Sequence, residues 1–226
     1  MCVSYTAKCI MSLGLICAAV IPAAAQNGLE SGQKLIEQAA NKRDQAVWVS
    51  KITVDGEEVH PGIPFQAGND WLEKMSISLT NRTAKTIIYV CITLGFPETG
   101  DGRTPATPQR MLNIIVGRLS AVAAFSGRTG KPLFIDPATK PLSLLGYRTL
   151  EIRVGDYMAD LKTYVEPSMP VTQIKHCEIH RTSFFFDDGM RWDAGGFALP
   201  DPDHPGRYKY VEGRYFPGRP FIPPTQ

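Results

Sequence analysis

Two histidines and a cysteine lie close together in the segment TQIKHCEIHRTSFFF, and these residue types can bind a transition metal. They are His176, Cys177 and His180. The surrounding β-branched and aromatic residues predict a strand, in which His176 and His180 share a face about 13 Å apart. A zinc site would therefore need a bulge or a helical turn that redirects the side chains. The apolar alternation weakens at residues 176–180 and predicts a bulge there, but we expect structural or exposed histidines and no metal site.

Five aspartates form a second candidate, because oxygen-rich loops bind Ca²⁺ in secreted proteins. They are Asp187, Asp188, Asp193, Asp201 and Asp203. Their spacing does not match a calcium-loop motif, whereas Asp-Asp-Gly and Asp-Pro-Asp are typical of turns. We therefore expect turn chemistry here.

The sequence contains no motif of nucleophilic catalysis. It lacks GxSxG, and Cys177 beside His176 would point to the opposite face of a strand, where His176 cannot activate it. A glycosidase-like pair of acids depends on the separation of the carboxylates in space, which the sequence does not show. We predict no catalytic residue, no cofactor and no metal.

The C-terminal segment GRYKYVEGRYFPGRPF is the candidate binding surface, because aromatic and basic residues alternate in it and prolines keep it extended. Such a surface suits a protein or a polysaccharide partner. The alternative, which we expect to be commoner, is that the segment covers an edge or a face of its own domain. The aromatic residues of the predicted surface are Tyr208, Tyr210, Tyr215 and Phe216.

The N-terminus predicts export. Lys8 precedes an apolar stretch that ends in Ala23-Ala24-Ala25, a pattern typical of a secretory signal peptide cleaved after Ala25. The apolar stretch is shorter than the roughly 20 residues that a membrane helix needs. We therefore predict a secreted or periplasmic protein with no membrane span in the mature chain.

Cleavage leaves two cysteines, Cys91 and Cys177. In an oxidising compartment they can form one disulfide, and equally they can be two separate buried thiols, since spacing alone does not decide.

Charge excludes one class of partner. The full chain carries a net charge of +2, and removal of residues 1–25 takes away one lysine and no acid, which leaves +1. A nearly neutral chain has no field to attract nucleic acid.

Apolar periodicity predicts a mostly β protein. Residues 75–79 and 88–96 alternate on either side of a short polar loop, which favours a β-hairpin with one shared buried face. Asp187-Asp188-Gly189 predicts a second hairpin between residues 171–186 and 190–197. Two further strands are expected at residues 47–54 and 147–154, and a short helix at residues 156–165. About seven strands predict an antiparallel two-sheet β-sandwich of immunoglobulin-like type with one or two short helices.

The expected domain organisation has four parts. A signal peptide (1–25) precedes a polar leader (26–46), which forms a short helix or stays frayed. The β-sandwich (47–198) follows, and a Pro- and aromatic-rich tail (199–226) ends the chain.

Two segments, DWLEKMSISLTNRTAKTIIYVCITLGFPE and FFFDDGMRWDAGGF, resemble exported bacterial proteins with an immunoglobulin-like β-sandwich and no assigned activity. The resemblance covers about half of the chain and implies only location and fold. We expect a binding or structural interaction module. The alternative is a metal- or carboxylate-dependent extracellular hydrolase.

Overall fold

The structure is a computed structural model that describes residues 29–41, 45–100, 109–118, 140–193, 196–204 and 207–211. The predicted signal peptide lies outside these residues. Within them the protein is mostly β, with twelve strands in two sheets.

The larger sheet has eight strands and is built around the long strand β9 (His176–Phe186). One side of β9 pairs with β6 (Ile87–Phe96), which in turn pairs with β7 (Arg110–Gly117). The other side pairs with β1 (Gln33–Gln38) along the first half of β9 and with β10 (Arg191–Asp193) along the second half. The sheet continues from β1 and β10 to three more strands, β4 (Phe65–Gln66), β11 (Gly196–Pro200) and β12 (Tyr208–Val211).

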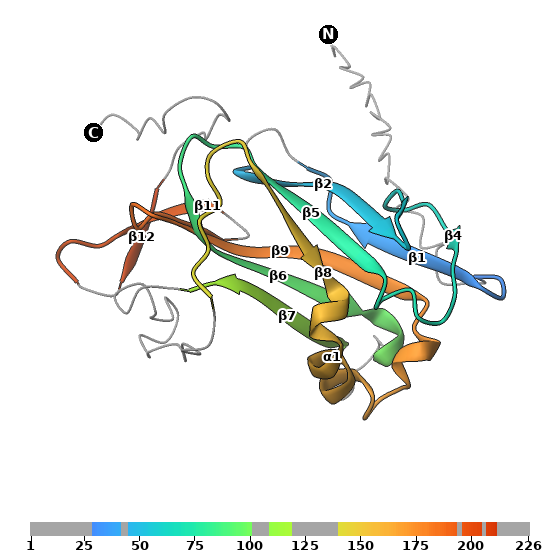
Figure 1. The fold of residues 1–226 in the computed structure, drawn as a ribbon. Coiled ribbons are helices and arrows are strands. Elements are labelled where there is room, and N and C mark those ends of the chain that lie inside the picture. Colours follow the sequence, from blue (N-terminus) through green and yellow to red (C-terminus); the bar gives the residue numbers. More distant parts are fainter. Residues whose placement is uncertain are drawn as a thin grey trace, which may run out of the picture.

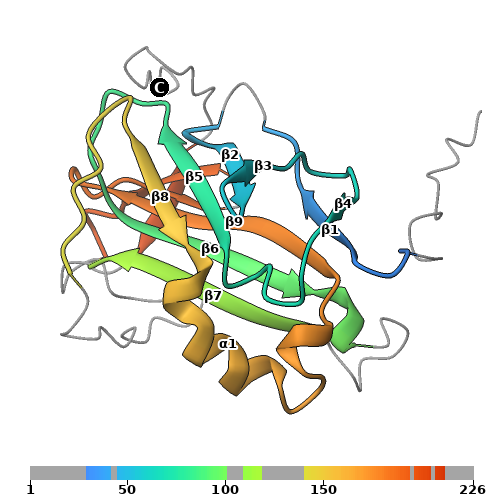
Figure 2. The same ribbon diagram turned by 45° about the vertical axis from the view of Figure 1, so that its right-hand side comes forward.

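The smaller sheet has four antiparallel strands in the order β3-β2-β5-β8. Figures 1 and 2 show that it lies across the β9-β6-β7 part of the larger sheet. Its strands are β2 (Val47–Val54), β3 (Glu57–Glu58), β5 (Met75–Asn81) and β8 (Thr149–Arg153).

The hydrophobic core lies between the sheets and follows from strand alternation. Every second residue of β5 and of β6 points inward, and these side chains form one buried cluster with those of β2, β8 and β9. The inward residues of β5 and β6 are Met75, Ile77, Leu79, Val90, Ile92, Leu94 and Phe96. The two-layer sandwich architecture predicted from the sequence is therefore confirmed.

The predicted hairpin between β5 and β6 is wrong. Strand β5 pairs with β2 and β8, whereas β6 pairs with β7 and β9, so the chain crosses from one sheet to the other between them. Both strands bury their apolar faces in the same core, but from opposite layers. Alternation shows which face of a strand is buried and does not show which strand is its neighbour.

The second hairpin is confirmed: β9 and β10 pair antiparallel across Asp187-Asp188-Gly189, and Gly189 has a φ of 83°. The sheets are not wholly antiparallel as predicted, because β1 runs parallel to β9.

The short helix considered in the leader does not form, since residues 33–38 are strand β1. The predicted bulge near residues 176–180 is also misplaced. The pairing is regular there, and the register shifts where Arg181 and Ser183 face Ile92 and Cys91.

The predicted helix at residues 156–165 is present as α1 (Met158–Val165), after the 3-10 turn η2 (Val154–Tyr157). Leu161 and Val165 of α1 are buried in the core. Figure 2 shows that the helix lies at one end of the sandwich, beside β7. Two further 3-10 turns are η1 (Pro97–Thr99) and η3 (Val171–Gln173). None of the described helices is long and apolar enough to cross a membrane.

Cys91 and Cys177 are both buried, and they do not form the disulfide considered from the sequence. Cys177 belongs to the core cluster, whereas Cys91 alternates with the core residues of β6 and lies on the opposite face of the same sheet. Burial raises the pKa of the Cys177 thiol, which keeps it protonated and unreactive.

Arg181 holds the chain where it passes from β1 to β2. Its buried guanidinium donates hydrogen bonds to the carbonyl oxygen of Ala39 (2.9 Å), that of Ala40 (3.2 Å) and Oδ1 of Asn41 (2.7 Å). The Asn41 side chain in turn pairs with the backbone of Val49, accepting from its N–H at 3.1 Å and donating to its carbonyl at 2.7 Å. One arginine therefore ties β9 of the larger sheet to β2 of the smaller sheet.

We expect Arg181→Leu to lower the free energy of unfolding by about 2–3 kcal/mol, because it leaves buried acceptors without a donor. Urea unfolding followed by circular dichroism measures this loss. Arg153→Leu is the matched control, since the Arg153 side chain is exposed and forms an ion pair with the exposed Glu151. Equal midpoints for wild type and Arg181→Leu would contradict the assignment.

Lys34 is a second buried cation. Its side chain is only 2% exposed, and Nζ donates to the carbonyl oxygen of Ile174 at 3.3 Å. Trp71, which is fully buried, donates Nε1–H to the same oxygen at 2.9 Å. Burial, with a smaller contribution from the charge of Lys175, lowers the pKa of Lys34 below the 10.5 of an exposed lysine.

We expect Lys34→Met to raise the free energy of unfolding at pH 7 by about 1 kcal/mol, since the ammonium no longer has to be buried while Trp71 still satisfies the Ile174 carbonyl. The pKa of Lys34 is lower in the folded state, so the wild type gains stability as pH rises toward 10.5. The difference between the two proteins should therefore shrink between pH 7 and pH 10. Urea titrations across this range test both points, and a difference independent of pH would contradict them.

Candidate functional site

Three side chains capable of binding a metal meet on the outer face of the larger sheet. Because side chains alternate along a strand, His176, Glu178 and His180 of β9 all point away from the core. The parallel pairing of β1 places Glu37 directly beside Glu178. Strand pairing therefore brings a residue from near the N-terminus to a segment 140 positions later.

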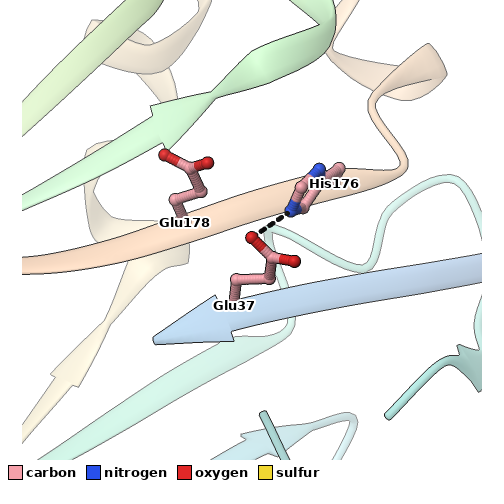
Figure 3. Close-up of side chains that lie close together, drawn as sticks. All are labelled: Glu37, His176 and Glu178. Atoms are coloured by element: carbon pink, nitrogen blue, oxygen red, sulfur yellow. Dashed lines mark ion pairs between the residues drawn. The ribbon is translucent and has the colours of Figure 1, made fainter. Parts of the chain in front are cut away.

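Figure 3 shows that Glu37 and His176 face each other from neighbouring strands, with Glu178 on the same strand as His176. One ligand atom from each side chain lies within 4.8 Å of the others. Nε2 of His176 is 3.4 Å from Oε2 of Glu37, and the histidine side chain is 17% exposed. Ligands bound to Zn²⁺ at about 2.0–2.2 Å are themselves roughly 3.4 Å apart, so the His176–Glu37 pair already has the spacing of two zinc ligands.

The backbone of His176 is hydrogen-bonded to a side chain of η1. Oε2 of Glu98 accepts hydrogen bonds from the backbone N–H groups of Lys175 (2.8 Å) and His176 (3.2 Å). This contact fixes the point at which β9 begins. The ring nitrogen Nε2 of His176 is buried and makes no hydrogen bond within the described residues, since its contact with Glu37 lacks hydrogen-bond geometry. A buried nitrogen in this state is suited to a further partner such as a cation.

Glu178 is held by two donors. Nε2 of Gln109 and Nε2 of His180 each lie 3.1 Å from the same carboxylate oxygen, Oε2. No hydrogen bond to the second oxygen of Glu178 is found within the part of the chain that the structure describes. His180, 47% exposed, is on the rim of the cluster.

An open pocket of about 420 Å³ adjoins the cluster. Glu37, Glu178 and His180 form its polar wall, and Ala39, Pro61 and Gly62 are among the residues of its other walls. An ion held by Glu37, His176 and Glu178 would therefore be reachable from solvent.

The chemistry of this donor set fits a first-row divalent ion. Imidazole and carboxylate ligands suit Zn²⁺, Mn²⁺ or Fe²⁺, and two carboxylates balance the charge of one divalent cation. Three protein ligands leave at least one coordination position for water or another molecule. A metal ion bound by these three side chains would therefore have an open coordination position.

The other sequence candidates do not join this cluster. Cys177 points into the core. Asp188 forms an ion pair with Lys85, and its Oδ1 accepts from the N–H of Met190 in the β9–β10 turn. Asp201 accepts from the N–H of Asp203, from His204 and from Lys209, whose ammonium lowers the pKa of Asp201 to about 2. Asp188 and Asp201 are therefore engaged in turns and ion pairs.

The predicted aromatic surface is only partly described. Tyr208 of β12 packs edge-to-face on Phe185, which contacts Tyr89 in the same way, and the Arg191 guanidinium lies 4.5 Å from the Tyr208 ring. Tyr210 is 64% exposed. Tyr215 and Phe216 lie outside the described residues. Tyr208 thus covers part of its own sheet. This is the alternative that we expected for the tail.

Sequence reasoning missed Glu37 and Glu178. The pattern His-x-Glu-x-His at residues 176–180 places three metal-binding side chains on one strand face, and this was the available signal. No sequence signal identified Glu37, because its position depends on the pairing of β1 with β9.

Three comparisons with known proteins complete the description: no family model, no curated protein and no solved structure matches this chain.

Proposed function

We propose that this protein is a binding module that holds a divalent transition metal ion through Glu37, His176 and Glu178. The observation that supports it best is the buried Nε2 of His176, which faces a carboxylate at 3.4 Å and has no hydrogen bond within the described residues. A bound cation would satisfy this nitrogen and both carboxylates together.

The wider setting of this function is part of the same proposal. The signal-peptide pattern of residues 1–25 supports a secreted or periplasmic location. The two facing sheets support an immunoglobulin-like sandwich, from which the parallel β1–β9 pair departs. The partner would be a protein or a polysaccharide, and the exposed Tyr210 beside Tyr208 supports contact through β12 and the tail.

A second candidate is a metal-dependent hydrolase, which the pocket beside Glu37, Glu178 and His180 favours. An open Zn²⁺ position binds and activates water, and a neighbouring carboxylate or imidazole can accept its proton.

We expect the metal-free full chain to bind one Zn²⁺ per molecule in a calorimetric titration. His176→Gln, Glu37→Gln and Glu178→Gln should each weaken binding by more than about 100-fold, beyond what the loss of an outer partner costs. Glu151→Gln, at an exposed acid of the smaller sheet, is the control and should bind like wild type. Mg²⁺ should bind far more weakly, because imidazole is a poor ligand for this hard ion. Absence of Zn²⁺ binding, or equal affinity in His176→Gln, would refute the proposal.

Turnover separates the two candidates. The Zn²⁺-loaded protein is assayed with chromogenic acetate and phosphate esters, and His176→Gln is assayed in parallel as the metal-free control. For a binding module we expect no hydrolysis above the control. Hydrolysis that disappears in His176→Gln would instead establish the hydrolase.

A further inference from the structure

Gln109 reaches Glu178 across an intervening strand. Gln109 immediately precedes β7, whereas Glu178 is on β9, and β6 lies between them. Two strand spacings of about 4.8 Å separate β7 from β9. The Gln109 amide nevertheless donates to Oε2 of Glu178 at 3.1 Å, so its side chain passes over the backbone of β6.

Gly95 is the residue of β6 that this crossing requires. It pairs with Glu178 on one side and with Met111 on the other, so a side chain at this position would project from the outer face between them. A Cβ atom on Gly95 would come closer to Nε2 of Gln109 than Cβ atoms come to any neighbour in real structures. The absence of a side chain at Gly95 is what leaves room for the contact.

The contact with Gln109 constrains one oxygen of the Glu178 carboxylate, Oε2. Gln109, before β7, and His180, on β9, donate to the same oxygen, which restricts rotation of the carboxylate. Outer partners of this kind orient metal ligands and commonly contribute about 10–100-fold to metal affinity.

We propose that Gln109 is a positioning residue of the metal centre, which directs the second oxygen of Glu178 to the ion, and that Gly95 is needed for it to do so. This inference rests on the proposed metal binding. Gln109 and Gly95 would not contact the ion themselves. Part of the metal affinity of the centre would therefore depend on the β6–β7 side of the sheet.

The test is a double-mutant cycle on Zn²⁺ affinity in the full chain, with Gln109→Leu, Gly95→Ala and the pair. We expect each single variant to bind about tenfold more weakly than wild type. The double variant should bind no more weakly than Gln109→Leu, because Gly95 acts only through Gln109. Asn113→Leu is the matched control: Asn113 is an amide on β7 that accepts from Thr93 at 2.7 Å, and its loss should leave affinity unchanged.

A second readout separates positioning from general stability. The visible absorption spectrum of the Co²⁺-loaded protein reports coordination geometry, and we expect it to change in Gln109→Leu and Gly95→Ala but not in Asn113→Leu. Thermal unfolding of the metal-free variants verifies that each is folded, and Gln109→Ala provides a second variant if Gln109→Leu is not.

The outcomes are distinct. Wild-type affinity and spectrum in Gln109→Leu, or losses in Gly95→Ala and Gln109→Leu that add in the double variant, would overturn the role of this pair while leaving metal binding intact. Failure of the wild type to bind Zn²⁺ would overturn both proposals.

Discussion

The parallel pairing of β1 with β9 is the contact on which most of this structure depends. It joins residues 33–38 to residues 176–179 and so brings the first described strand to the centre of the larger sheet. The pairing places Glu37 beside Glu178. It also places Ala39 and Ala40, which follow β1, within hydrogen-bond distance of the Arg181 guanidinium. Parallel strands cannot be joined by a tight turn, and here nearly the whole domain forms the connection.

The packing between the sheets explains why the few buried polar side chains are hydrogen-bonded. Inward positions of β1, β5, β6 and β9 are apolar apart from a few groups that are hydrogen-bonded, notably Lys34 on β1 and Arg181 on β9. Arg181 lies where the chain passes from one sheet to the other. Its guanidinium donates to backbone carbonyls there that would otherwise lack a donor. A buried charge is tolerated when it is hydrogen-bonded in this way. Lys34 has one acceptor and shares it with Trp71, so its burial is less well compensated.

The candidate metal centre uses the opposite face of the same strand. Because β9 is flanked by β1 and β6, outward side chains from neighbouring strands lie about 5 Å apart, a spacing suited to several ligands around one ion. Ligands on paired strands are also held rigidly. The Glu98 contact to the first residues of β9 adds support from η1, and the Gln109 contact over Gly95 adds support from the residue before β7.

The sequence by itself determined the β class, the two-layer sandwich, the inward faces of the strands, the β9–β10 hairpin and the short helix. Each of these depends on local periodicity or on turn residues such as Asp188 and Gly189, which act over a few positions. Only the tertiary structure decided which strands are neighbours: β5 and β6 separate into different sheets, and the leader supplies β1 instead of a helix. The same limit applies to the site. His176, Glu178 and His180 share a face because a strand alternates, but Glu37 and Gln109 join them through pairing across long separations, and pairing depends on the packing of the whole domain.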